Sequence, residues 1–88
     1  MTYRYRADVL RALWRHGVHP RPDTAPELVR SYVRDLYKYE IRKLRQRMLC
    51  QEFPRLEYSG RVEALRDRYA VLSLLPHQFL ESPSAGPG

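Results

Sequence analysis

The chain has 88 residues, of which 43% are hydrophobic, and it carries a formal net charge of +6. This length predicts one marginally stable domain, and the hydrophobic content excludes global disorder. The single cysteine, Cys50, excludes an internal disulfide, and no apolar run approaches the roughly 20 residues that span a bilayer. Since the first residues also lack the apolar region of a secretory signal, we expect a soluble intracellular protein.

Arginine dominates the basic residues, because Lys38 and Lys43 are the two lysines among 16 basic residues. The guanidinium group is planar and binds carboxylates and phosphates through paired hydrogen bonds. The composition therefore predicts an acidic partner, which is a protein, a nucleic acid or an anionic membrane surface.

The first predicted helix covers about residues 4–16. Gly17 follows it and is the residue type that most often ends a helix in the left-handed conformation. The helix is amphipathic, with arginines on one face and apolar residues on the other. The apolar face contains Val9, Leu10, Leu13 and Trp14.

The second predicted helix covers about residues 24–52. Thr24 and Glu27 have the spacing of a capping box, and Pro26 suits the first turn. The helix should stop before Pro54. Its apolar residues repeat every three or four positions, and they are Val29, Val33, Leu36, Tyr37, Ile41, Leu44 and Met48.

The third predicted helix covers about residues 56–75 and ends at Pro76. Its apolar residues have the spacing of a helix that packs along another helix. Together, the three segments predict an all-α fold, a small antiparallel three-helix bundle with a long central helix, in a helical domain of residues 1–80. The small and polar residues 81–88 predict a disordered tail. The apolar residues of the third helix are Tyr58, Val62, Leu65, Tyr69 and Leu72.

A basic stripe lies opposite the apolar face of the second predicted helix. Like charges at this spacing repel each other, which favours a surface that binds an anionic partner. The alternative is a solvated face whose charge is offset by Asp35 and Glu40. The stripe contains Arg30, Arg34, Lys38, Arg42 and Arg45.

Three tyrosines, Tyr32, Tyr37 and Tyr39, accompany this stripe. RNA-binding proteins stack bases on exposed aromatic rings. However, these tyrosines fall on or beside the apolar face, which favours packing in the core with the hydroxyl group at its edge. Glu40 interrupts the apolar edge, and we expect it to pair with an arginine, such as one on the third helix.

The sequence predicts no catalytic residue, metal site or cofactor, and so no enzyme. His16 and His19 are separated by the predicted helix end, while Cys50 and His77 are far apart in sequence. A structural zinc site needs four convergent ligands, and a nucleophilic cysteine needs an adjacent base. We expect Cys50 to be a small apolar residue near the end of the second helix.

The segment VLRALWR, residues 9–15, resembles the first helix of the LYR-motif family of small, arginine-rich, three-helix mitochondrial proteins. Leu13, Trp14 and Arg15 stand where the family has Leu-Tyr-Arg, and the later YVRD with its arginine row resembles the family's second helix. The literal Leu36-Tyr37-Lys38 lies in the second predicted helix instead of the first.

This resemblance implies an adaptor or assembly factor for respiratory complexes, iron–sulfur transfer or mitochondrial ribosomes. It also implies binding to the acidic mitochondrial acyl carrier protein. Under this reading, Leu13, Trp14 and Arg15 form the motif, while Arg30, Arg34 and Lys38 contact the acidic partner.

We therefore expect a non-enzymatic adaptor, assembly factor or chaperone of a mitochondrial respiratory-chain or ribosomal complex. A matrix location is expected because the first 22 residues contain five arginines and one acid, Asp8, on an amphipathic helix. The alternatives are an RNA- or ribosome-associated protein, or a small structural subunit of a large complex, located in the cytosol or nucleus. The predicted partner-binding residues are Arg30, Arg34, Lys38, Arg42, Arg45, Leu13, Trp14 and Arg15.

Overall fold

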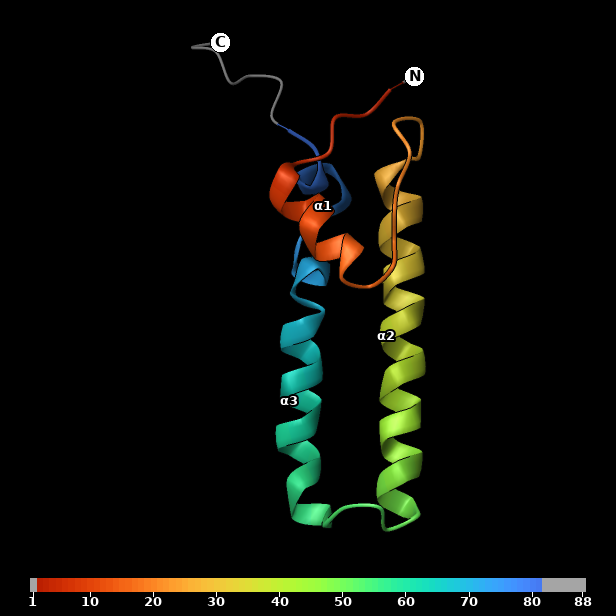
Figure 1. Cartoon of the computed structure of the whole chain (residues 1–88), viewed down its shortest axis with the longest axis vertical. Helices are drawn as coiled ribbons and strands as arrows, with labels where there is room; N and C mark the ends of the chain where they lie inside the picture. Colours follow the sequence, from red (N-terminus) through yellow and green to blue (C-terminus); the bar gives the residue numbers. More distant parts are fainter. Residues whose placement is uncertain (1, 82–88) are drawn as a thin grey trace.

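A computed structural model of the chain describes residues 2–81 (Figure 1). This part is mainly helical, with α1 at Ala7–Trp14, α2 at Pro26–Leu49 and α3 at Tyr58–Arg68. Short 3-10 helices lie at Arg55–Glu57 (η1), Ala70–Ser73 (η2) and Pro76–Phe79 (η3). Residues 2–81 contain no strand, although an isolated antiparallel bridge joins Tyr5 to Leu80. The all-helical prediction is therefore confirmed in its coarse form.

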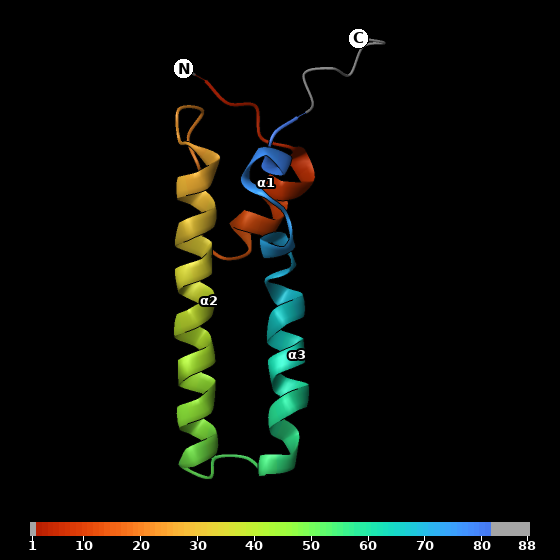
Figure 2. The ribbon, with the colours of Figure 1, turned by 180° about the vertical axis from the view of Figure 1, so that it is seen from behind.

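Helices α2 and α3 lie side by side along the long axis of the molecule (Figures 1 and 2). The short segment between them lies at one end, and α1 gathers with η2 and η3 at the other end. The molecule measures 54 × 24 × 16 Å. In so elongated a molecule, the side chains of α2 either pack in a narrow core or are exposed to solvent.

The hydrophobic core runs between α2 and the elements beside it. The apolar faces of the second and third predicted helices are confirmed, since every position expected on them is buried or partly buried. Phe79 of η3 and Leu13 of α1 are fully buried, so the core also includes the first and last helical segments of the described chain. The buried residues are Tyr5, Val9, Leu13, Val18, Val29, Val33, Leu44, Phe53, Leu65, Tyr69, Val71 and Phe79.

The first helix is shorter than the predicted range 4–16. The backbone around Tyr5 and Arg6 is extended, because Tyr5 pairs with Leu80 and the Arg6 N–H donates to the Phe79 carbonyl oxygen at 2.9 Å. Helix α1 therefore begins at Ala7. A pairing between residues more than 70 positions apart leaves no sign in local periodicity.

The predicted glycine at the end of the first helix is confirmed. Gly17 has φ 73°, and its N–H donates to the Trp14 carbonyl oxygen at 2.9 Å. The Val18 N–H donates to the Leu13 carbonyl oxygen at 3.0 Å. These two bonds form a Schellman motif, and Leu13 and Val18, whose side chains usually touch in this motif, both belong to the core.

The predicted capping box at Thr24 is wrong. The residue before the first helical position is Ala25, and no side chain caps the helix. The Thr24 hydroxyl oxygen instead accepts a hydrogen bond from the Arg21 N–H at 3.0 Å, within the preceding turn. Pro26 fills the first position of α2, where its missing N–H costs nothing.

The third helix also covers less than the predicted range 56–75. Helix α3 ends at Arg68, and η2 and η3 continue the chain in short turns. Arg30 binds the chain beyond this end, because its guanidinium group donates to the Leu72 and Leu74 carbonyl oxygens, both at 2.8 Å. These oxygens then need no partner within a helix. The predicted tail 81–88 lies outside the described residues, except for Glu81.

Helix α2 ends at Leu49 rather than at residue 52, in a second Schellman motif that places a glutamine in the left-handed region. Gln51 has φ 59°, and its N–H donates to the Met48 carbonyl oxygen at 3.0 Å. The Glu52 N–H donates to the Arg47 carbonyl oxygen, also at 3.0 Å. A residue with a Cβ atom adopts this conformation at a steric cost, which glycine avoids.

We expect Gln51→Gly to raise the free energy of unfolding by about 1 kcal/mol, because it removes this steric cost. The matched control is Gln46→Gly on the exposed side of α2, which should lower the free energy of unfolding by about 1 kcal/mol. Urea denaturation followed by circular dichroism measures both changes. A less stable Gln51→Gly protein would contradict the assigned turn.

A second prediction concerns the contact between α2 and α3. Leu65 is 6% exposed and Leu56 is 96% exposed. Leu65→Ala should lower the free energy of unfolding by about 2–4 kcal/mol, since it leaves a cavity in the core. Leu56→Ala should change it by less than about 0.5 kcal/mol. Equal effects of the two substitutions in thermal denaturation would show that this core is wrongly assigned.

Candidate functional site

The five cations of the predicted stripe on α2 have different environments. Arg30 is partly buried, and its Nε and Nη2 atoms donate to the carbonyl oxygens of Leu74 and Leu72. Its guanidinium group therefore fastens the segment after α3 to α2. Because these bonds occupy the side chain, we leave Arg30 out of the binding surface to which the sequence had assigned it.

The other four cations of the stripe, which we call the cationic face, are exposed along one flank of α2. Within residues 2–81, no ion pair involves any of them. They span about 16 Å of the helix, at 1.5 Å per residue. No acidic side chain of the described residues therefore pairs with the cationic face. It consists of Arg34, Lys38, Arg42 and Arg45.

The two acids expected near this stripe do not neutralise it. Asp35 lies three residues before Lys38, but no ion pair between them is present in the described chain. Glu40 instead faces α3, where its Oε1 lies 3.8 Å from Nη2 of Arg68. The predicted pairing of Glu40 with an arginine of the third helix is therefore confirmed.

Glu40 belongs to a polar network that joins the three helices. The Tyr69 hydroxyl group donates to Glu40 Oε2, and the ring of His16 stacks on that of Tyr69 with centroids 4.1 Å apart. His16 Nε2 lies 2.8 Å from the Arg68 carbonyl oxygen. Burial, followed by the hydrogen bond to Glu40, raises the pKa of Tyr69 to about 12. This arrangement fixes the end of α1 against α2 and α3.

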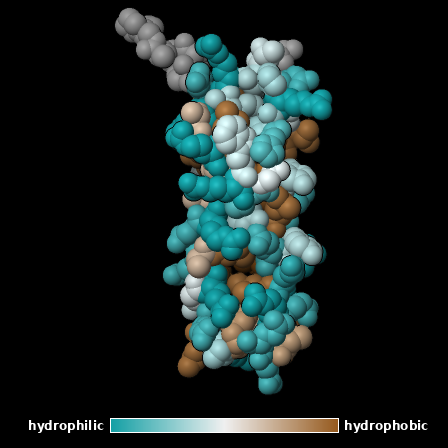
Figure 3. Space-filling model, in the orientation of Figure 1, coloured by the Kyte–Doolittle hydropathy of each residue, from teal (hydrophilic) through white to brown (hydrophobic). Residues whose placement is uncertain are grey.

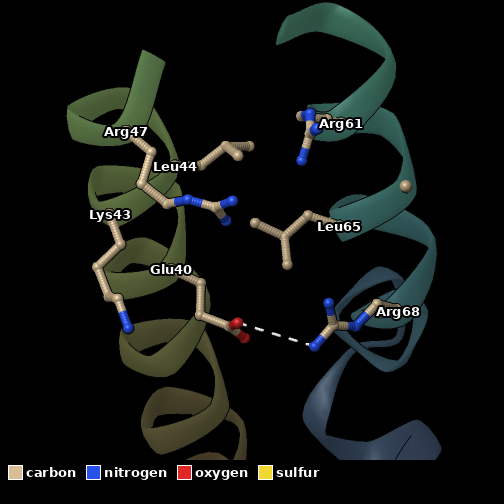
Figure 4. Close-up of a pocket in the computed structure, with 8 residues that line it drawn as sticks. Glu40, Lys43, Leu44, Arg47, Arg61, Leu65 and Arg68 are labelled. Atoms are coloured by element: carbon tan, nitrogen blue, oxygen red, sulfur yellow. Dashed lines mark ion pairs between the residues drawn. The ribbon is translucent and has the colours of Figure 1, made fainter. Parts of the chain in front are cut away.

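A second basic surface lies in a groove between α2 and α3 (Figure 4). The groove has a volume of about 280 Å³. Leu44 and Leu65 lie between the two rows of charged side chains, and Figure 3 shows hydrophobic surface inside a hollow on this part of the molecule. The charged residues that line the groove are Glu40, Lys43, Arg47, Arg61 and Arg68.

Most cations of this groove already have anionic partners within the chain. Arg47 Nε lies 3.2 Å from Glu52 Oε1, and Arg61 Nη2 lies 3.1 Å from Glu57 Oε1. Both guanidinium groups also lie over the Phe53 ring, at 5.7 and 4.1 Å from its centroid. The charge of the groove is therefore partly neutralised within the described chain, unlike that of the cationic face.

The structure separates the three residues of the predicted Leu-Trp-Arg motif. Leu13 is fully buried in the core, so it cannot touch a partner while the chain is folded. Trp14 is 50% exposed, which corrects its placement on the apolar face of the first helix. Its ring stacks on His19 with centroids 6.2 Å apart. Arg15 is exposed.

The prediction that the tyrosines of α2 pack in the core is correct for one of them. Tyr37 is partly buried and contacts the edge of the Tyr69 ring. Tyr32 and Tyr39 are instead 58% and 57% exposed. Cys50, expected to be apolar and near the helix end, is indeed next to the end of α2, but it is exposed.

Across residues 2–81, no group of three or more His, Cys, Asp or Glu side chains is placed to hold a metal ion. The same residues contain no helix with the length and apolar character required to cross a bilayer.

Comparison of the chain with protein family models, curated protein sequences and solved structures finds no match. Its function must therefore be inferred from its own geometry and charge. The cationic face is the strongest candidate, because its side chains are exposed, aligned and without an ion pair among the described residues.

The raised pKa values of Tyr5 and Tyr69 allow a direct test of how these two side chains pack in the core. Burial raises the pKa of Tyr5 and of Tyr69 to about 12, from the usual 10. Because the folded state binds these protons more tightly, the resulting stability is present below pH 10 and is lost between about pH 10 and 12. A phenolate absorbance titration should show a component near pH 12 that shrinks in Tyr69→Phe and in Tyr5→Phe. An unchanged component in both variants would contradict this assignment.

Proposed function

We propose that the chain is a non-enzymatic adaptor or assembly factor that docks an acidic protein through the cationic face. The observation that carries this proposal is the exposure of four cations on one flank of α2 without an ion pair in the described chain. Cations at this spacing repel each other, and carboxylates of a partner would remove this repulsion.

Contacts with carbonyl and carboxylate oxygens distinguish the arginines that stabilise the fold from the cations that we propose bind a partner. Arg30, Arg47, Arg61 and Arg68 bind carbonyl or carboxylate oxygens of the chain itself. The cationic face lacks such acidic partners among the described residues. Replacing its residues should therefore change binding more than folding.

The location and the partner are part of the same proposal. We place the adaptor in the mitochondrial matrix, where it would help to assemble a respiratory-chain or ribosomal complex. Support comes from the arginine-rich segment around α1 and from the similarity of Leu13, Trp14 and Arg15 to the LYR motif. The acidic mitochondrial acyl carrier protein is the first partner to test.

The proposed scaffold is an antiparallel three-helix bundle with α2 as its long central helix. The 24 residues of α2 and its position beside α3 support this arrangement (Figure 1). A long helix that is packed on one side leaves its other side free for a partner.

The exposed Tyr32 and Tyr39 favour one second candidate, an RNA-associated protein. Cations beside exposed aromatic rings can bind phosphates while the rings stack on bases. Salt dependence would not separate the two candidates, since both are electrostatic. Nuclease treatment does separate them.

We expect affinity capture of the tagged chain from a mitochondrial matrix extract to recover an acidic protein, with or without nuclease. The double variant Arg34→Glu with Arg45→Glu should lose this protein, because reversed charges repel its carboxylates. The matched control is Arg55→Glu with Arg66→Glu, which changes net charge equally at exposed arginines outside the cationic face. Mass spectrometry and circular dichroism measure recovery and folding.

Three outcomes of this experiment differ in meaning. Loss of recovery in the first variant alone supports docking on the cationic face. Equal loss in both variants would show an unspecific charge effect and would contradict the proposal. Capture that disappears with nuclease would assign the cationic face to RNA.

A further inference from the structure

The outer side of α2 carries most of the exposed large hydrophobic residues. The described residues include seven such side chains, and four of them are on this helix. Exposed apolar side chains that gather on one element usually mark an interaction surface. The four are Leu28 at 67%, Tyr32 at 58%, Tyr39 at 57% and Leu49 at 57% exposure.

These four residues belong to a regular row, which we call the outer seam. Its positions alternate by four and three residues, the spacing with which one helix packs along another. All seven positions are exposed, and the row spans about 31 Å at 1.5 Å per residue. The outer seam consists of Leu28, Tyr32, Asp35, Tyr39, Arg42, Gln46 and Leu49.

The outer seam faces away from the core of the molecule. The inner side of α2 carries the buried Val29, Val33 and Leu44. Helix α2 therefore has two apolar rows, and within residues 2–81 the outer one has no helix packed on it. The described chain uses one row for folding, whereas the other row meets the segment before α2 at Leu28 and Tyr32, which line a pocket with His19 and Pro20.

Cations border the outer seam on both sides. Helical geometry places Lys38 and Arg45 of the cationic face along one border and Lys43 along the other. Lys43 Nζ lies 5.4 Å from the centroid of the Tyr39 ring, so it stays close to the seam. Within the seam itself, Arg42 adds a cation and Asp35 is the single acid.

These charges select the kind of helix that fits. A second copy of this chain also carries a net charge of +6, and it would bring its own Lys38 and Arg45 beside the same bordering cations of the first copy. A helix with carboxylates beside its apolar row would instead pair with Lys38, Lys43 and Arg45. Charge complementarity therefore favours an acidic partner over self-association.

We infer that the outer seam docks an acidic amphipathic helix of another protein, whose apolar residues pack on the two leucines and two tyrosines of the seam. Its flanking carboxylates bind Lys38 and Arg45 on one border and Lys43 on the other. Asp35 and Arg42 lie opposite polar residues of the partner helix, and these two contacts set the register in which the two helices pack. This inference rests on the proposed function and adds the shape of the partner.

The test uses a synthetic helical peptide of about 22 residues, with leucine at the alternating spacing and glutamate on both flanks. A peptide with lysine in place of glutamate is the charge control. Fluorescence anisotropy with the full chain should show binding of the glutamate peptide and at least about tenfold weaker binding of the lysine peptide. Failure of the glutamate peptide to bind, or equal binding of both, would overturn the inference.

Substitutions locate the contact on the outer seam. Tyr32→Ala with Tyr39→Ala should weaken binding of the glutamate peptide at least about tenfold, because it removes two aromatic anchors. The matched control, Leu56→Ala with Leu75→Ala, alters two exposed leucines outside the seam and should change affinity less than about twofold. Equal effects would overturn the inference, and a seam-dependent dimer in sedimentation velocity would assign the seam to a second copy.

The same variants distinguish this inference from the proposed function. If Arg34→Glu with Arg45→Glu abolishes capture of the acidic protein while the tyrosine pair does not, docking on the cationic face stands and the outer seam is overturned. If neither pair affects capture, both are overturned.

Discussion

Helix α2 buries one side along most of its length, and α3, η2 and η3 pack against it. This contact constrains the rest of the molecule, because a narrow core offers no other surface on which so short a chain can bury its apolar residues. Polar contacts at the edges then fix the packing. Arg30 binds the carbonyl oxygens of the chain after α3, and Glu40 binds Tyr69 and Arg68 at its centre.

The core was largely readable from the sequence, whereas the helix ends were not. The spacing of Val33 and Leu44 on α2, and of Leu65 on α3, identifies the sides that meet. However, the start of α1 depends on the bridge between Tyr5 and Leu80, and the chain after α3 is held by Arg30 through the carbonyl groups of Leu72 and Leu74. These are contacts between distant residues, which local patterns do not encode.

The candidate site was only partly readable for a related reason. The cationic face appears in the spacing of its residues, but Arg30 looks identical to its neighbours until the fold brings carbonyl groups to it. Tyr32 and Tyr39 were assigned to the core because aromatic residues near an apolar row usually belong there. The regular spacing from Leu28 to Leu49 was present in the sequence, but the inner row of the same helix obscured it.

The two apolar rows of α2 have a consequence for how such a protein can change over evolutionary time. Substitutions on the exposed row alter few contacts in the core, so most of them should leave the free energy of unfolding nearly constant. Substitutions on the buried row alter folding directly. Substitutions on the exposed row can therefore change which partner is recognised while the fold is preserved. New binding specificities can arise in this way without variants that fail to fold.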